Sequence, residues 1–192
     1  MILKNLDRYR IILASNSPRR RQLLADLGLD FNVLTLDTEE DFPEGLSMSE
    51  IPVYLAELKA QPFDIKDDDL LVITADTIVW CDGEVLTKPA DSADAKRILQ
   101  KLSGKKHQVL TGVCIKTKDK QRSFFSKTDV CFKQLSDEEI DYYIEHYQPF
   151  DKAGAYGIQE WIGYIGIEKI EGSYFNVMGL PVQQLYQELK KF

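Results

Sequence analysis

Two serines and three arginines at the start of an expected helix form a pattern that suits a phosphate group. Residues 15–21 read Ser-Asn-Ser-Pro-Arg-Arg-Arg. Pro18 suits the first helical position, because its missing N–H has no partner there. The helix dipole makes this end positive, so three cations are unfavourable unless an anion binds. Backbone N–H groups, hydroxyls and guanidinium groups would together bind phosphate; the alternative is a solvated arginine run on a surface helix.

A carboxylate inside an apolar strand is the strongest single candidate for chemistry. Asp76 interrupts the run Leu70–Trp80, which otherwise has the composition of a buried strand. A buried carboxylate is costly unless it is paired, hydrogen-bonded or bound to a metal. Asp76 is therefore a candidate general base or metal ligand, and the alternative is an aspartate at a strand end that faces solvent.

The remaining charged candidates are ordinary when each is taken alone. Lys59 closes an expected helix, where a cation is favoured in any case, and Lys88 precedes Pro89 at the end of a short strand. The acidic cluster Glu39-Glu40-Asp41 has the composition of a solvated loop. Its alternative role is a set of oxygen ligands for magnesium.

The segment Asp151–Gln159 could approach a ligand closely. Its two glycines permit a close approach of the backbone, and Gln159 carries both a donor and an acceptor that could contact the edge of a base. The alternative is a tight turn with a polar tip.

Composition excludes several classes of function. The chain has 192 residues and a net charge of −7, whereas a general binder of nucleic-acid polymers is normally basic. Its three cysteines lack zinc-site spacing, and His107 and His146 offer little material for a metal site or a catalytic triad. Neither a P-loop nor a Rossmann motif occurs. Without a membrane-length apolar run or a signal peptide, we expect a cytoplasmic protein.

The expected elements alternate between strands and helices, and they predict a mixed β-sheet with helices packed around it. In chain order they are strand Arg10–Ala14, helix Pro18–Leu27, strand Phe31–Thr35, a helix from the capping box at Ser47 to Lys59, strands Leu70–Trp80 and Glu84–Leu86, a helix from Asp91 or Ser92 to Leu102, strands Gln108–Lys116 and Ser123–Phe132, a helix from the capping box at Ser136 to Tyr147, a loop over Gly154–Gly166 that leads into strand Tyr164–Ile170, and helix Val182–Lys191.

Taken together, the motifs resemble those of the Maf family of nucleotide pyrophosphatases, also called septum-formation inhibitors. The matching segments are Leu13–Arg20, Ala75–Val79, Gly83–Pro89, Leu102–Gly104, Asp151–Gln159, Gly172–Tyr174 and Val177–Pro181. They occur in the family's order and span nearly the whole chain. Arg21 and the aromatic run that begins at Trp161 depart from the family's pattern.

The resemblance implies a fold and an activity. The expected fold is that of inosine triphosphate pyrophosphatases, an elongated mixed β-sheet with flanking helices and two lobes around a cleft, with residues 1–192 forming a single domain. The expected activity is metal-dependent hydrolysis of a nucleoside triphosphate to the monophosphate and diphosphate. The stretch that ends in Gln159 is similar to the branch that acts on dTTP and UTP, whereas the branch that acts on 7-methyl-GTP has another sequence there.

The resemblance also suggests roles for individual residues. The expected catalytic residues are Asp76, Lys88 and Arg19; the expected substrate-binding residues are Ser15, Ser17, Arg19, Arg20, Lys59, Thr77, Lys88 and Gln159; the expected metal ligands are Glu39, Glu40 and Asp76. The metal would be Mg²⁺, with Mn²⁺ as the alternative. Asp76 would be either a second metal ligand or the base that takes the proton of the attacking water, and the resemblance favours the base.

Two other functions are compatible with the same residues. One is a nucleotide-binding regulator of septum formation without significant turnover. The other is an enzyme that removes aberrant purine nucleotides. In each case the expected partner is a small nucleoside triphosphate, and neither a nucleic-acid polymer nor a membrane is expected. A homodimer is compatible with all three functions.

Overall fold

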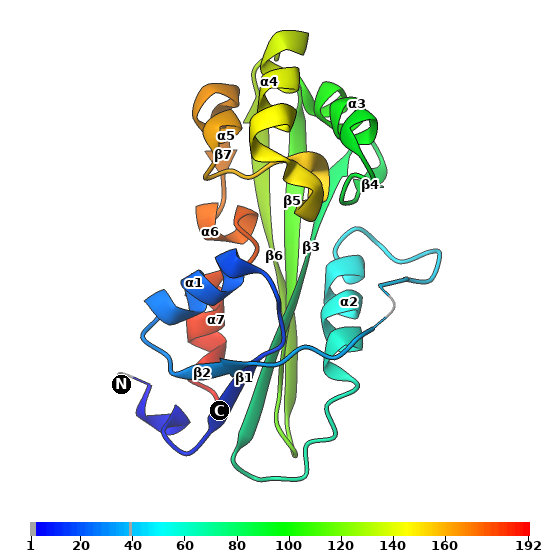
Figure 1. Cartoon of the computed structure of the whole chain (residues 1–192). Coiled ribbons are helices and arrows are strands. Elements are labelled where there is room, and N and C mark those ends of the chain that lie inside the picture. The colour runs from blue at the N-terminus through cyan, green and yellow to red at the C-terminus, as the bar shows by residue number, and fades with distance from the viewer. Residues whose placement is uncertain (1–2, 39) are drawn as a thin grey trace. The chain divides into compact units, whose positions relative to one another are not determined.

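The computed structural model describes residues 3–38 and 40–192, and in this part of the chain seven strands form one mixed sheet (Figure 1). The strands are β1 (Arg10–Leu13), β2 (Phe31–Val33), β3 (Leu70–Cys81), β4 (Glu84–Leu86), β5 (Lys106–Lys116), β6 (Gln121–Phe132) and β7 (Ile167–Glu171). Their order is β2-β1-β3-β5-β6-β7, with β4 paired to β3. Strand β1 runs parallel to β2 and β3, whereas β4 and β7 run antiparallel to their neighbours. The prediction of a mixed sheet is confirmed.

Helices flank this sheet. They are α1 (Pro18–Asp26), α2 (Glu50–Ala60), α3 (Ser92–Leu102), α4 (Asp137–Tyr147), α5 (Trp161–Gly166), α6 (Tyr174–Val177) and α7 (Val182–Leu189), with short 3₁₀ turns at Lys4–Leu6, Pro149–Asp151 and Ala153–Ala155. None of the helices in the described residues combines the length and the apolar composition that a membrane crossing needs.

The chain divides into two compact units. Unit 1 comprises Met1–Asp76, Thr111–Ser126 and Gly179–Phe192, and unit 2 comprises Thr77–Leu110 and Lys127–Met178. Strands β3, β5 and β6 contribute residues to both units. Asp76 is the last residue of β3 that belongs to unit 1, and Thr77 is the first that belongs to unit 2.

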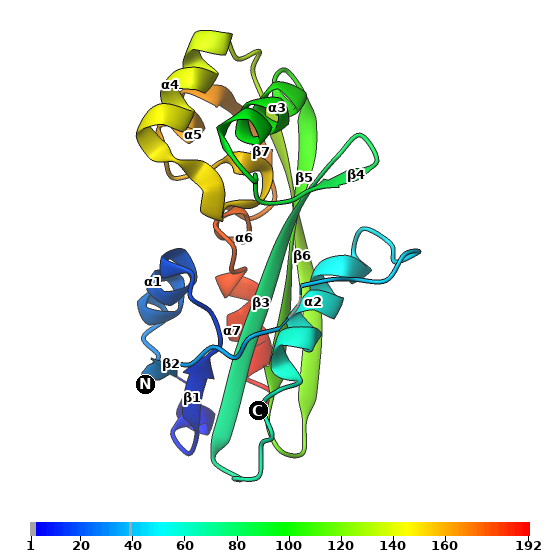
Figure 2. The same ribbon diagram turned by 45° about the vertical axis from the view of Figure 1, so that its right-hand side comes forward.

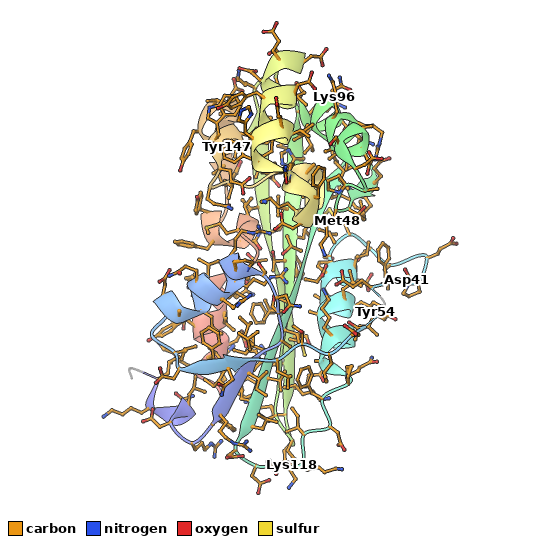
Figure 3. The ribbon with its side chains drawn as sticks, viewed as in Figure 1. Asp41, Met48, Tyr54, Lys96, Lys118 and Tyr147 are labelled. Atoms are coloured by element: carbon orange, nitrogen blue, oxygen red, sulfur yellow. The ribbon has the colours of Figure 1, made fainter. Side chains whose placement is uncertain are left out.

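Within unit 1, α1 and α7 lie on one side of β3, and α2 lies on the other (Figures 1 and 2). The chain approaches α2 through an irregular segment over residues 34–38 and 40–46, which carries Asp41 and runs beside Tyr54 of α2 (Figure 3). Below α2, Phe63 and Ile65 pack with Ala14 of the β1 end and Val72 of β3 in a small apolar cluster.

Helix α2 is held unusually close to the sheet. A Cβ added at Gly112 of β5 would lie 2.1 Å from the carbonyl oxygen of Pro52, so only glycine fits beneath the first turns. Thr74 of β3 donates its hydroxyl to the carbonyl of Ala56 at 2.5 Å. Lys116 of β5 donates to the carbonyl of Ala60 at 3.1 Å and thereby caps the helix end. These contacts fix both the height and the rotation of α2.

Unit 2 has a core of its own. Helices α3, α4 and α5 gather beside β5, β6 and β7 (Figure 2), and apolar residues from all these elements form one cluster. His107 of β5 is 1% exposed and shares a hydrogen bond of 2.8 Å with the Tyr156 hydroxyl. Burial lowers the pKa of His107 to about 4, so this histidine is neutral at physiological pH and belongs to the core.

Most expected elements occur where the sequence predicts them, and one prediction is wrong. The strand expected over Tyr164–Ile170 begins only at Ile167, because residues 161–166 form helix α5. The N–H of Gly163 donates to the carbonyl of Glu160, and a Cβ at Gly163 would lie 1.9 Å from the carbonyl oxygen of Ile158. This segment therefore winds into a helical turn through a tight contact that its glycine and aromatic composition does not reveal.

We expect Gly112→Ala to destabilise the protein by about 1–3 kcal/mol, the usual cost of overpacking. The added methyl group must displace the backbone at Pro52 or move β5, because the nearest atom belongs to the main chain. Urea denaturation measures the change. Gly166→Ala is the matched control: its Cβ would meet only side-chain atoms, of Leu135 at 3.2 Å and of Ile162 at 3.7 Å, so little stability should be lost. Equal stability of the two variants would show that the contact with α2 is not a constraint.

Candidate functional site

The two serines before α1 organise the start of that helix. Ser17 is the N-cap, and its hydroxyl oxygen accepts the N–H of Arg20 at 3.4 Å. The hydroxyl oxygen of Ser15 accepts the N–H of Ser17 at 3.2 Å. Both oxygens thus serve as acceptors within the loop, and each hydroxyl hydrogen can still be donated to an anion. Pro18 occupies the first helical position, as predicted.

The three arginines that follow have different surroundings. Arg20 is half-buried and donates through Nε to the carbonyl of Gly179 and through Nη1 to the carbonyl of Ala75, both at 2.8 Å. Arg21 is exposed and donates to the carbonyl of Asn16 at 3.0 Å. Arg19 is half-buried. Arg20 therefore ties α1 to the residue before Asp76 and to the segment before α7, a role that the sequence alone did not suggest.

The charges around Arg20 show which candidates share one region of unit 1. Burial lowers the pKa of Arg20, the negative charges of Asp76 and Glu40 oppose this change, and the positive charge of Arg19 adds to it. Arginine stays protonated at any pH at which proteins fold. Arg20 is thus a permanent cation beside Asp76, Glu40 and Arg19.

Asp76 and Lys59 form a nearly buried ion pair. The Nζ atom of Lys59 lies 2.5 Å from Oδ1 of Asp76, and the two side chains are 16% and 11% exposed. The same ammonium group lies 3.0 Å from Oε1 of Glu40, whose side chain is 46% exposed. Lys59 stands in the last turn of α2, and the contacts at Gly112 and Thr74 direct that helix onto β3. One cation therefore links two carboxylates from different segments.

This carboxylate pair has the chemistry that a hard divalent cation requires. Magnesium is held in proteins by one or two carboxylates together with oxygens of a bound phosphate. Asp76 and Glu40 supply two such carboxylates, while the described residues contain no group of three potential His, Cys, Asp or Glu ligands. The third expected ligand, Glu39, lies outside the residues that the structure describes.

Three further candidates belong to unit 2. Thr77 follows Asp76 in β3 and is half-buried, and Lys88 is exposed just after β4. Gln159 lies in the loop before α5. Its Oε1 atom is buried, and within the described part of the chain that atom has no hydrogen-bond partner. A buried carbonyl oxygen without a donor is costly, so Gln159 is ready to accept a donor from a ligand.

A charged network beside Gln159 was not foreseen from the sequence. Lys152 is 8% exposed and pairs with Glu160, and the carboxylate of Glu160 accepts the hydroxyl of Tyr143 from α4. The only sequence signal is a lysine followed at once by small and apolar residues. The pairing with Glu160 and Tyr143 depends on the fold and has no local signature.

Comparisons with known proteins agree with the motif pattern. Residues 10–192 match the family described as Maf-like protein. The chain is 60% identical over 192 residues to a dTTP/UTP pyrophosphatase of Phocaeicola vulgatus, covering 99% of this chain and 100% of that one. It is 53% identical over 195 residues to a dTTP/UTP pyrophosphatase of Porphyromonas gingivalis, covering 100% and 98%. Among solved structures it is similar to the Staphylococcus aureus Ham1 protein, with 19% identity, a TM-score of 0.47, and coverage of 64% and 71%.

Replacing Lys59 should lower the stability of the folded protein, because Lys59 neutralises the nearly buried charge of Asp76. We expect Lys59→Met to destabilise the protein by about 3 kcal/mol, because it removes the ammonium group that lies 2.5 Å from the nearly buried Asp76 carboxylate. The double variant Lys59→Met/Asp76→Asn should regain most of that loss. Urea denaturation measures all of them. Lys66→Met is the matched control, since the pair of Lys66 with Asp64 is exposed and its loss should change the stability far less. A fully stable Lys59→Met variant would contradict the assignment of a buried pair.

Proposed function

Because the chain belongs to the Maf family, we propose that it is a nucleoside triphosphate pyrophosphatase that hydrolyses dTTP and UTP to the monophosphate and diphosphate. Full-length similarity to relatives named for that activity supports the reaction and the substrates. The structural observation that carries the proposal is the cluster of Asp76, Lys59 and Glu40 beside the arginine-rich start of α1. Carboxylates and cations at one place are what hydrolysis of a phosphoanhydride needs.

The phosphate chain is bound by cations and by the start of α1. Arg19 binds phosphate oxygens together with the hydroxyl groups of Ser15 and Ser17 and the positive end of the helix. Lys59 and Lys88 neutralise charge that develops on the diphosphate leaving group. Arg20 contributes its fixed charge, but its bonds to two backbone carbonyls make it chiefly a positioning residue.

The reaction is an in-line attack of water on the α-phosphorus. The Asp76 carboxylate accepts the proton of the attacking water, and its ion pair with Lys59 fixes its orientation. Magnesium, when bound by Glu40 and Asp76, with Glu39 as the further predicted ligand, would supply positive charge to the phosphate oxygens. Mn²⁺ is the alternative metal, and Asp76 as a metal ligand is the alternative to Asp76 as the base.

The pyrimidine is contacted by Thr77 and Gln159. Uracil and thymine each present an N–H donor, which matches the buried Oε1 atom of Gln159 that lacks a donor among the described residues. We take residues 1–192 as one catalytic domain that acts on free nucleotides in the cytoplasm. Its net charge of −7 supports a small anionic substrate held by a local cation cluster over a nucleic-acid polymer. A homodimer is compatible with this function.

The identity of the products tests the proposed reaction. With magnesium present, dTTP should give dTMP and diphosphate, which anion-exchange chromatography separates from the other nucleotides. A panel of canonical and modified triphosphates measures the substrate range. Release of dTDP and orthophosphate would place the attack at the γ-phosphorus and contradict the mechanism. Thermal stabilisation by dTTP without any product would identify a binding protein instead of an enzyme.

Arg19→Ala should lower kcat/KM for dTTP by at least ~10²-fold, the effect of removing one donor that stabilises a transition state. Folding should be unharmed, because the substitution removes a cation that opposes the helix dipole. Arg21→Ala is the matched control: Arg21 lies in the same helical turn but is exposed and bonds the carbonyl of Asn16. Similar activity of the two variants would remove Arg19 from the phosphate site.

Asp76→Asn should lower kcat by ~10²-fold or more, the low end of what a general base contributes. Asparagine has nearly the same shape, so stability should change little, and Lys59 keeps its contact with Glu40. Measuring kcat against magnesium concentration separates the two roles. A low rate that does not respond to magnesium supports the base, and partial recovery in excess magnesium supports the ligand. An unchanged kcat would leave Asp76 outside the mechanism.

A further inference from the structure

The loop that carries Gln159 is fastened by a buried hydrogen-bonded network within unit 2. The hydroxyl of Tyr143 accepts the N–H of Gly157 at 3.0 Å and donates to the Glu160 carboxylate. The other carboxylate oxygen of Glu160 lies 3.1 Å from Nζ of Lys152. Gln159 is therefore flanked on both sides by residues that Tyr143 binds, one through its backbone and one through its side chain.

The charges of this network are nearly enclosed. Tyr143 is fully buried, and the side chains of Lys152 and Glu160 are 9% and 19% exposed. The Lys152 ammonium group has a second carboxylate, that of Asp151, at 2.6 Å. Burial and the neighbouring Glu160 raise the pKa of Tyr143, so the hydroxyl stays protonated and donates. Hydrogen bonds to ionised groups in such surroundings are strong and directional.

The backbone of the same loop leaves little freedom for rearrangement. A Cβ at Gly157 would lie 2.7 Å from the carboxyl carbon of Glu160. The N–H of Glu160 donates to the carbonyl of Gly157 at 3.0 Å, which closes a tight turn around Gln159. The turn is thus compressed against the very carboxylate that Tyr143 and Lys152 hold. A shift of Glu160 must move its neighbour in the chain, Gln159.

We propose that Tyr143, Lys152 and Glu160 are positioning residues that fix the carboxamide of Gln159, and that they thereby set the affinity for uracil and thymine. This inference rests on the proposed function, in which Gln159 contacts the pyrimidine. A buried acceptor gains from a ligand donor only if it is held at hydrogen-bonding distance. The network supplies that rigidity without containing any of the residues assigned to the phosphates, to the metal or to proton transfer.

The expected kinetic effect is therefore confined to binding. A contact that is equally strong in the ground state and the transition state changes KM and leaves kcat unaltered. Glu160→Gln removes the charge that holds Lys152, and Tyr143→Phe removes the hydroxyl that bridges the loop. For dTTP, each variant should raise KM at least about 10-fold, equivalent to about 1.4 kcal/mol, while kcat changes less than about twofold. KM is measured for every variant at the same excess of magnesium, so that differences in metal binding do not affect the comparison.

Glu171→Gln is the matched control for a lost carboxylate charge in unit 2. The pair of Glu171 with Lys169 on β7 is exposed, and its loss should alter neither parameter. Melting temperatures of all variants separate positioning from a loss of folding. Tyr143→Phe keeps the buried ring, and it provides the test if Glu160→Gln does not fold.

The decisive measurement is the combination with Gln159→Ala. If Glu160 acts through Gln159, adding Glu160→Gln to Gln159→Ala should raise KM no further. Additive effects of the two substitutions would overturn the inference. A high KM for Gln159→Ala with an unchanged KM for Glu160→Gln and Tyr143→Phe would overturn the inference and leave the proposed function intact. An unchanged KM for Gln159→Ala would refute the proposed role of Gln159 in base binding, and the inference with it.

Discussion

The nearly buried carboxylate of Asp76 is the constraint on which the rest of unit 1 depends. An ionised side chain at this depth needs a cation at contact distance, and Lys59 supplies it from α2. Lys59 can reach Asp76 only if the helix lies close to the sheet, which explains why glycine stands at position 112. The hydroxyl of Thr74, two residues before Asp76 in β3, fixes the helix against sliding. The close packing of α2 on the sheet therefore also provides the cation that neutralises Asp76 of β3.

The same carboxylate explains how three arginines are accommodated at a helix start that disfavours cations. Arg20 turns back to the carbonyl of Ala75, and Asp76 offsets its charge. Arg21 remains at the surface, where solvent screens it. Arg19 is partly buried, and it is the arginine that the sequence pattern assigns to a phosphate group. The arginine run thus divides into a structural residue, a solvated residue and a candidate ligand-binding residue, a division that spacing alone cannot predict.

What could be predicted from the sequence is what depends on neighbouring residues. The capping box at Ser136, the cap at Asp91 and the Asp-Gly turn after β3 are local, and all occur as expected. The box at Ser47 is only half formed: the Glu50 carboxylate accepts the N–H of Ser47, but the helix begins at Glu50. Helix α5 was missed although its contacts are local, because the close approach of Gly163 to the carbonyl of Ile158 has no signature in the composition of the segment. The sequence indicated that a buried Asp76 needs a partner, but no local feature identified Lys59 as that partner. The cleft between two lobes stays a prediction of the family resemblance.

Stability by itself does not explain why one nearly buried ion pair contains Asp76 in unit 1 and another lies next to Gln159 in unit 2. Replacing such a pair with apolar residues of similar volume is commonly neutral or stabilising, because desolvation offsets the attraction between the charges. What an apolar replacement cannot supply is direction, since dispersion contacts tolerate rotation that a charged hydrogen bond does not. Lys59 fixes the carboxylate of Asp76, and Lys152 with Tyr143 fixes the carboxylate that follows Gln159. We infer that the first pair serves to orient Asp76 and the second to orient Gln159. The stability of each unit comes from its apolar core.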